Sequence, residues 1–253
     1  LLWMASLAFK PPSDIVSGSP QFWPTTFTLE NFAEIFSQTL FTRALITSLG
    51  IALLATTVSV ILAMFAAYAI ARLEFRGKTV LLSLALGIAM FPQAALVGPL
   101  FDMWRGLGIY DTWVGLIIPY LTFALPLSIW TMSAFFRQIP WEMEHAAQVD
   151  GATRWQAFRK VIVPLAAPGV VTTAILTFFF CWNDFLFAIS LTSTDSARTV
   201  PAALAFFQGA SYFESPVPYI MAASVIVTIP VVILVLIFQR RIVAGLTSGA
   251  VKG

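Results

Sequence analysis

Five long apolar segments dominate this sequence and decide what kind of fold it can adopt. The only charged residue in them is Asp184, in the fourth segment. A helix rises about 1.5 Å per residue, so roughly 20 residues cross a hydrocarbon core about 30 Å thick. Hydrophobic residues make up 59% of the chain and charged residues 10%, against about 25% charge in soluble domains. We therefore predict an all-α membrane protein with spans in residues 44–71, 79–101, 112–136, 161–191 and 215–239.

The first residues of the chain are mostly apolar up to Lys10. They are too few to cross a bilayer, which needs about 20 residues, and they lack the basic start of a signal peptide. We expect them to be the end of a further helix that is truncated here. The prediction is then six transmembrane helices in a single transmembrane domain covering residues 1–253.

Lysine and arginine are unevenly divided between the two sides that these spans define. Positively charged loops stay in the cytoplasm, so the richer side is predicted to be cytoplasmic, with both termini on it. The poorer side carries Lys10, Arg43, Arg105 and Arg198. The richer side carries Arg72, Arg76, Lys78, Arg137, Arg154, Arg159, Lys160, Arg240, Arg241 and Lys252.

A short amphipathic segment, residues 139–163, lies on the predicted cytoplasmic side between the third and fourth apolar segments. Pro140 suits the first turn of a helix, where a missing N–H is harmless. Glu142 and Glu144 follow in that turn and favour its positive end. The expected apolar face consists of residues at helical spacing, namely Ile139, Met143, Ala146 and Ala147.

Gly151 is expected to end this first helix, because glycine adopts the left-handed conformation without penalty. Thr153 and Gln156 have the spacing of a capping box, which predicts a second helix running to Pro164, where the next span would begin. The hairpin has two interpretations. It either lies on lipid headgroups, which its basic residues and Trp155 would suit, or it offers a helix to a partner protein.

The hairpin resembles the EAA loop of ABC-importer permeases, which reads Glu-Ala-Ala, three residues, Gly, nine residues, Ile-x-Leu-Pro. His145 stands where the glutamate is expected, although Glu144 precedes it. Val161 and Val163 replace the Ile and Leu. The positions that match at the family spacing are Ala146, Ala147, Gly151 and Pro164.

The resemblance covers most of the chain and is closest to the carbohydrate branch of these permeases, the MalG-like group. In order along the chain, the similar segments are FKP (9–11), TLENF (28–32), AYAIAR (67–72), FRGK (75–78) and WNDFL (182–186). The EAA pattern alone is moderately specific, but these segments in this order make the likeness strong.

The resemblance implies a type I ABC-importer permease fold in a bacterial plasma (inner) membrane. The chain would be half of a heterodimer with a second permease subunit, above two ATPase subunits, and an extracytoplasmic sugar-binding protein would deliver a sugar such as maltose or trehalose. The ATPase subunits would bind ATP and Mg, so this chain would be no enzyme and hold no cofactor. The coupling residues implied are Met143, Glu144, His145, Ala146, Ala147, Asp150, Gly151, Ala152 and Pro164.

Asp184 is the only acid within a predicted span, and intramembrane acids are costly and often functional. With Asn183 it is a candidate for a sugar path or outer gate, and Trp182 or Phe185 could stack on a sugar. Gln93, beside the kink expected at Pro92, is a weaker candidate. The alternative for Asp184 is a buried hydrogen bond to another helix of the bundle.

Other functions find little support in the sequence. The segment at residues 77–79 ends like a phosphate-binding loop, but Arg72 occupies the position of the first glycine. His145 is the only histidine and no Cys/His cluster accompanies it, which disfavours a zinc site. The basic residues are spread along one edge, so no nucleic-acid footprint is evident. An ion-coupled secondary transporter remains the alternative, although one acid near the outer end of a span is thin support for it.

Overall fold

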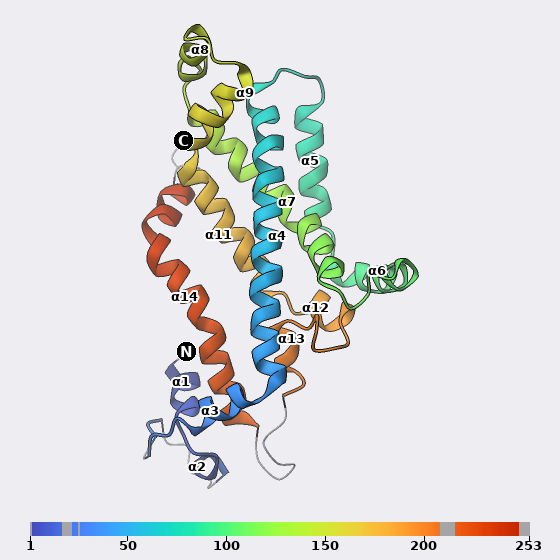
Figure 1. The fold of residues 1–253 in the computed structure, drawn as a ribbon, viewed down its shortest axis with the longest axis vertical. Coiled ribbons are helices and arrows are strands. Elements are labelled where there is room, and N and C mark those ends of the chain that lie inside the picture. Colours follow the sequence, from blue (N-terminus) through green and yellow to red (C-terminus); the bar gives the residue numbers. More distant parts are fainter. Residues whose placement is uncertain (1, 17–21, 25, 208–215, 248–253) are drawn as a thin grey trace. The chain divides into compact units, whose positions relative to one another are not determined.

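The computed structural model describes residues 2–16, 22–24, 26–207 and 216–247, and these form helices and turns with no strand among them (Figure 1). Within these described residues, three helices are long and apolar enough to cross a membrane, namely α4, α7 and the Val217–Phe238 part of α14. The helices are α1 Leu2–Ala8, α2 Pro12–Val16, α3 Glu30–Ser37, α4 Thr39–Arg72, α5 Lys78–Ala89, α6 Gln93–Leu107, α7 Trp113–Gln138, α8 Trp141–Val149, α9 Arg154–Ala157, η1 Phe158–Ile162 (a π-helix), α10 Val163–Leu165, α11 Ala167–Asn183, α12 Leu186–Leu191, α13 Val200–Leu204 and α14 Val217–Thr247.

Two of the five predicted spans are bent rather than continuous. Helices α5 and α6 meet at 86°, and the segment Arg154–Leu165 meets α11 at 71°. Pro92 lies in the first break, where it offers no N–H and disfavours helical backbone at the preceding residue. Counting each bent pair as one span gives up to five spans in the described part of the chain. The prediction of a sixth span, at the start of the chain, remains a prediction.

The helices sort into two compact units. Unit 1 comprises Leu1–Ile51, Ala94–Leu116 and Asn183–Leu236, and unit 2 comprises Ala52–Gln93, Ile117–Trp182 and Ile237–Gly253. The prediction of one permease domain is neither supported nor contradicted by this division.

Unit 1 is built around a cluster that brings α1 and α3 against α13 and the first turns of α4 and α14. Ile35, Phe41 and Val200 are fully buried in it. Asn31 is also fully buried, and its amide donates hydrogen bonds to the carbonyls of Ala8 and Lys10, each at 2.8 Å. The buried amide therefore joins α3 to the end of α1.

Unit 2 packs α4 and α7 against the second part of the hairpin and the residue Ala166 that follows it. Ala63 and Ala67 on α4 are fully buried and let the neighbouring backbones approach closely. Phe136 and Phe158 pack on the same cluster, and the Tyr68 and Phe158 rings lie 4.7 Å apart. This packing fixes the hairpin of residues 139–163 beside the last turns of α4.

Candidate functional site

The hairpin of residues 139–163 has the helix, turn and second helix that the sequence predicts. Helix α8 carries Glu142 and Glu144 in its first turn, with Pro140 as the residue before it rather than within it. Gly151 has a φ of 88°, the left-handed conformation expected of a terminating glycine. Figure 1 shows α8 and α9 as neighbours, and residues of the two helices are in contact.

The capping box is confirmed as well. The Thr153 hydroxyl accepts from the Gln156 N–H at 3.2 Å, and the Gln156 side chain accepts from the Thr153 N–H at 2.8 Å. Helix α9 then passes into the π-helix η1 and α10, and helix α11 begins at Ala167, after the bend. Proline is tolerated in a first helical turn, so Pro164 lies in the first turn of the short α10, and the bend follows that helix.

Glu144 is buried against α4 and is 5% exposed. The Tyr68 hydroxyl donates to its carboxylate at 2.6 Å, and the Arg72 Nε lies 3.8 Å from its other oxygen. That second distance is too long for a hydrogen bond, so the contact is an ionic one. A carboxylate at this depth is stabilised by the opposite charge of Arg72.

Arg72 makes three contacts with the hairpin. It is 5% exposed, and besides its ionic contact with Glu144 it donates to the Ile139 carbonyl at 2.6 Å. Its guanidinium also lies 4.5 Å from the centre of the Trp141 ring, a stacking contact that arginine favours. We refer to Tyr68, Arg72, Trp141 and Glu144 as the α4–α8 anchor.

The outward side of α8 differs from the apolar face that helical spacing predicts. Ile139 is buried before the helix begins, whereas Met143 and Ala146 are exposed. Because Glu144 faces α4, residues three and four positions on, Ala147 and Gln148, are only half exposed. Of the residues implied in coupling, those exposed to the surroundings are Met143, His145, Ala146, Asp150, Gly151 and Pro164, and Ala152 is half-buried.

The residues predicted to line a sugar path lie where α11 ends. Asn183 and Phe185 are exposed and Trp182 is buried, with its ring stacked on Phe178 at 5.5 Å. Asp184 is 9% exposed, and its carboxylate accepts from the Ala188 N–H at 3.0 Å. It thereby satisfies one of the backbone donors that have no partner within the first turn of α12. Gln93, half-buried, is the first residue of α6, after the bend at Pro92.

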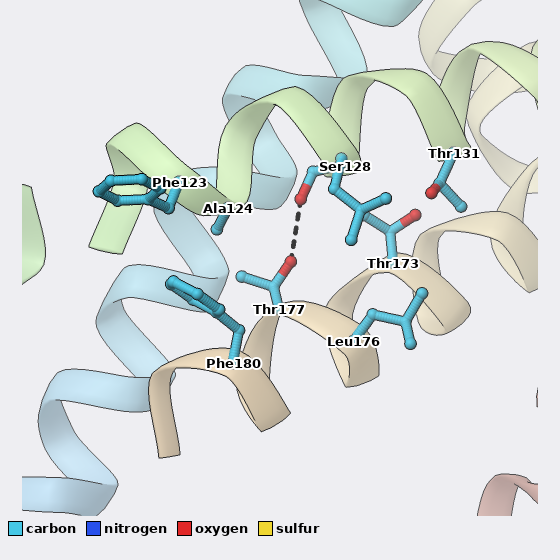
Figure 2. A pocket seen from close by; sticks show the side chains of 9 residues that line it. Phe123, Ala124, Ser128, Thr131, Thr173, Leu176, Thr177 and Phe180 are labelled. Atoms are coloured by element: carbon cyan, nitrogen blue, oxygen red, sulfur yellow. Dashed lines mark hydrogen bonds between the residues drawn. The ribbon is translucent and has the colours of Figure 1, made fainter. Parts of the chain in front are cut away.

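A pocket lies between α7 and α11, within unit 2 (Figure 2). Sequence reasoning did not find it. The sequence does carry a pattern that could have revealed the pocket. Hydroxyl residues recur one helical turn apart in two apolar segments, Ser128 with Thr131 and Thr173 with Thr177. The Ser128 and Thr177 hydroxyls are hydrogen-bonded at 2.9 Å, and Figure 2 shows this bond along the pocket wall.

A second polar cluster, in unit 1, was also missed. Asp111 has a φ of 58°, which is uncommon for a residue other than glycine. Its carboxylate accepts from the N–H groups of Ser193 and Thr194 at 2.8 and 3.1 Å and from the Thr194 hydroxyl at 2.6 Å. Burial raises the pKa of Asp111, but these hydrogen bonds outweigh it, so the pKa lies below its ordinary value.

Trp113 adds to this cluster, because its indole N–H donates to the Ser196 carbonyl at 3.1 Å. The Arg198 guanidinium donates to the Ser193 carbonyl at 2.7 Å. Together these bonds hold the loop after α12 against the turn before α7. We refer to Asp111, Trp113, Ser193, Thr194 and Arg198 as the Asp111 clasp.

Residues 15–248 match the family model described as "Binding-protein-dependent transport system inner membrane component". The chain belongs to this family. The permease is 58% identical to the "Trehalose transport system permease protein SugB" of Mycobacterium tuberculosis (strain CDC 1551 / Oshkosh), over 100% of this chain and 92% of that protein. It is 42% identical to the "Trehalose/maltose transport system permease protein MalG" of Thermococcus litoralis, over 100% of this chain and 90% of that protein.

The fold of the permease is similar to a chain in the crystal structure of "a bacterial ABC transporter involved in the import of the acidic polysaccharide alginate". The TM-score is 0.80 at 23% identity, over 94% of this chain and 88% of that chain. The predicted family and the all-helical, multi-pass inner-membrane character are thereby confirmed. The permease is a transport subunit without its own ATPase site, and its partner subunits handle ATP.

Proposed function

We propose that this permease forms one half of an ATP-driven importer for a disaccharide of the trehalose or maltose type. Two relatives that cover the whole chain are named for transport of these sugars. The partners in this proposal are a second permease subunit, two ATPase subunits and an extracytoplasmic sugar-binding protein. The complete assembly would have the six-span, type I arrangement with both termini in the cytoplasm.

The division of charge between the two units supports this orientation. The basic residues predicted to face outward, which are Lys10, Arg43, Arg105 and Arg198, all belong to unit 1. The predicted cytoplasmic residues from Arg72 to Lys160 all belong to unit 2. Since positive loops stay inside, we assign the hairpin that carries α8 to the cytoplasmic side.

The buried contact between Glu144 and Arg72 is the observation that carries the coupling proposal. It ties α8 to the last turn of α4 through a charge pair that is nearly closed to solvent. Removing one partner of such a pair costs about 3–5 kcal/mol. A helix held this firmly moves together with α4, so a push on α8 from an ATPase subunit becomes a movement of a membrane span.

The exposed residues of α8 supply the surface for that push. Met143 is 44% exposed and Val149 is 86% exposed, on a helix whose other side is anchored. Aliphatic side chains exposed on a short cytoplasmic helix favour a protein partner. His145, in the position of the usual glutamate, lies on the exposed side, with its ring centre 6.1 Å from that of Trp141.

The test uses the complete transporter with its binding protein, reconstituted in liposomes with labelled trehalose and maltose. We expect uptake only when ATP is supplied to the ATPase side. Glu144→Gln should keep the hydrogen bond with Tyr68 but lose the charge opposite Arg72, so that ATP hydrolysis continues with about tenfold less uptake per ATP. Glu142→Gln, at an exposed acid of the same helix, is the control and should behave like the wild type.

Two results would contradict the proposal. Uptake driven by an ion gradient without ATP would identify a secondary transporter instead. Equal uptake per ATP in Glu144→Gln, Glu142→Gln and the wild type would show that the α4–α8 anchor does not transmit the motion.

A further inference from the structure

The pocket between α7 and α11 contains a buried hydroxyl that has no hydrogen-bond partner. Thr173 is 1% exposed, lines the pocket, and its Oγ1 has no partner in the described structure. Figure 2 shows its hydroxyl on α11 directed toward the hydroxyl of Thr131 on α7. A buried hydroxyl without a hydrogen-bond partner lowers the stability of the fold. Its position on a pocket wall therefore indicates a ligand that supplies the missing hydrogen bond.

We propose that this pocket is a subsite that binds one sugar ring of the transported molecule, with the Thr173 hydroxyl as its principal polar contact. This proposal rests on the sugar-import function proposed above. It adds a direct contact with substrate in this half of the permease, in a region one to three helical turns before the predicted path residues Trp182 to Phe185.

The hydroxyl chain beside the pocket has the chemistry that a sugar requires. Ser59, Ser128 and Thr177 are linked in series at 3.3 and 2.9 Å, and all three are buried. Each hydroxyl donates one proton and accepts on its lone pairs, so the direction of the whole chain can reverse. Thr177 at the pocket wall can therefore donate to or accept from a ligand, and a sugar hydroxyl does both.

The remaining walls suit the apolar face of a sugar ring. Phe123 and Phe180 place aromatic rings beside the hydroxyl residues (Figure 2). All nine lining residues are uncharged, which disfavours an ionic ligand.

The experiment compares two neighbouring threonines in the reconstituted complete transporter. Thr173→Val removes the unpaired hydroxyl and keeps the shape of the side chain. Thr172→Val is the matched control, because Thr172 is equally buried, does not line the pocket, and donates its hydroxyl to the Pro168 carbonyl at 2.9 Å. Thr173→Ser restores the hydroxyl and serves as the rescue variant.

The readout is the maximal uptake rate for trehalose and for each of its monodeoxy analogues, at saturating binding protein and ATP. We expect Thr173→Val to lower trehalose uptake about 3- to 10-fold, the loss of one hydrogen bond. We also expect the wild type to transport one monodeoxy analogue more slowly than trehalose, and Thr173→Val to lose that difference. Thr172→Val and Thr173→Ser should resemble the wild type.

Three outcomes would overturn the subsite. The first is that Thr173→Val transports trehalose like the wild type, and the second is that Thr172→Val loses as much uptake as Thr173→Val. The third is that Thr173→Val loses uptake but still discriminates among the analogues as the wild type does, which would indicate that Thr173 acts through packing alone. Failure of the proposed import function would look different from these three outcomes. The wild-type complex would then show no ATP-driven uptake of trehalose or maltose, and the subsite proposal would be refuted together with the proposed function.

Discussion

Two polar anchors hold connecting segments in this permease, and they do so by opposite means. In unit 2, the α4–α8 anchor pairs Glu144 with Arg72, whose side chains are 6% and 2% exposed. In unit 1, the carboxylate of the Asp111 clasp is only partly covered and is held by neutral donors from Ser193 and Thr194. The first anchor needs an opposite charge, whereas the second does not.

The difference shows how burial sets the consequence of losing a partner. A buried pair whose two charges are desolvated contributes modestly as a pair but is strongly disrupted when one member is removed. A partly exposed carboxylate can exchange its protein donors for water, so its loss is milder. Removing one residue of the contact between the hairpin of residues 139–163 and α4 should therefore destabilise the permease far more than removing one residue of the contact between the loop after α12 and the turn at Asp111.

The largest effect is expected for Arg72→Ala, which leaves Glu144 buried without its counter-charge. We expect the complex to lose about 3–5 kcal/mol of stability, enough to lower the yield of assembled transporter. Thermal stability of the detergent-purified complex measures this. The control is Arg76→Ala, at an exposed arginine four residues further along.

A double variant sharpens the same prediction. Arg72→Ala combined with Glu144→Ala should be more stable than Arg72→Ala alone, because no unpaired buried charge remains. If Arg72→Ala matches Arg76→Ala in stability, or if the double variant shows strictly additive losses, then the buried pair is not the basis of the anchor.

An intermediate effect on transport is expected for Gly151→Asp, which changes the exposed end of α8 without touching the anchor. Gly77→Asp is a matched control, since the two glycines have φ values of 88° and 90° and neither has an atom within 4 Å of an added Cβ. Both variants should therefore lose a similar roughly 1–2 kcal/mol through backbone strain. Only Gly151→Asp adds a negative charge where the ATPase is proposed to dock, so uptake should fall by at least about tenfold, or 1.4 kcal/mol.

Uptake and sugar-stimulated ATP hydrolysis of the two glycine variants decide this prediction. A similar loss in both would attribute the effect to backbone strain. Normal uptake and normal stimulation in Gly151→Asp would remove the end of α8 from the coupling surface.

Sequence patterns that act locally predicted the structure well. The hairpin, the left-handed Gly151 and the Thr153–Gln156 capping box all depend on residues close in the chain, and all are present. The five apolar segments also became helices, since length and lack of charge suffice for that. A kink was expected at Pro92, but the angles of 86° and 71° were not predicted, because a proline allows several geometries and the packing around it selects one.

Contacts between residues distant in the chain account for what was missed. Nothing near Glu144 indicates that it faces inward, because its partners Tyr68 and Arg72 lie more than 70 residues earlier. The pocket requires the hydroxyl faces of α7 and α11 to meet, which periodicity suggests for each helix but cannot establish for the pair. Asp184 was identified as the unusual acid, yet its hydrogen bond to Ala188 depends on a break in the helix that composition does not reveal.

The smallest effect is expected for Asp111→Asn, and it should depend on pH. Asparagine tolerates the left-handed backbone and can still accept hydrogen bonds, so only the negative charge is removed, at a cost of about 1 kcal/mol or less near neutral pH. The depressed pKa of Asp111 means that its charge contributes stability above the ordinary aspartate pKa of about 3.9, and that this contribution is lost as the pH falls through the lower folded-state value.

The difference in melting temperature between wild type and Asp111→Asn should therefore be constant near neutral pH and vanish in acid. Asp102→Asn, at an exposed acid of the same unit, supplies the control and should show no such trend. A difference that persists in acid would mean that the amide disturbs the clasp sterically. A loss as large as that of Arg72→Ala would mean that partial exposure does not soften the removal of an anchor, and the contrast between the two units would not hold.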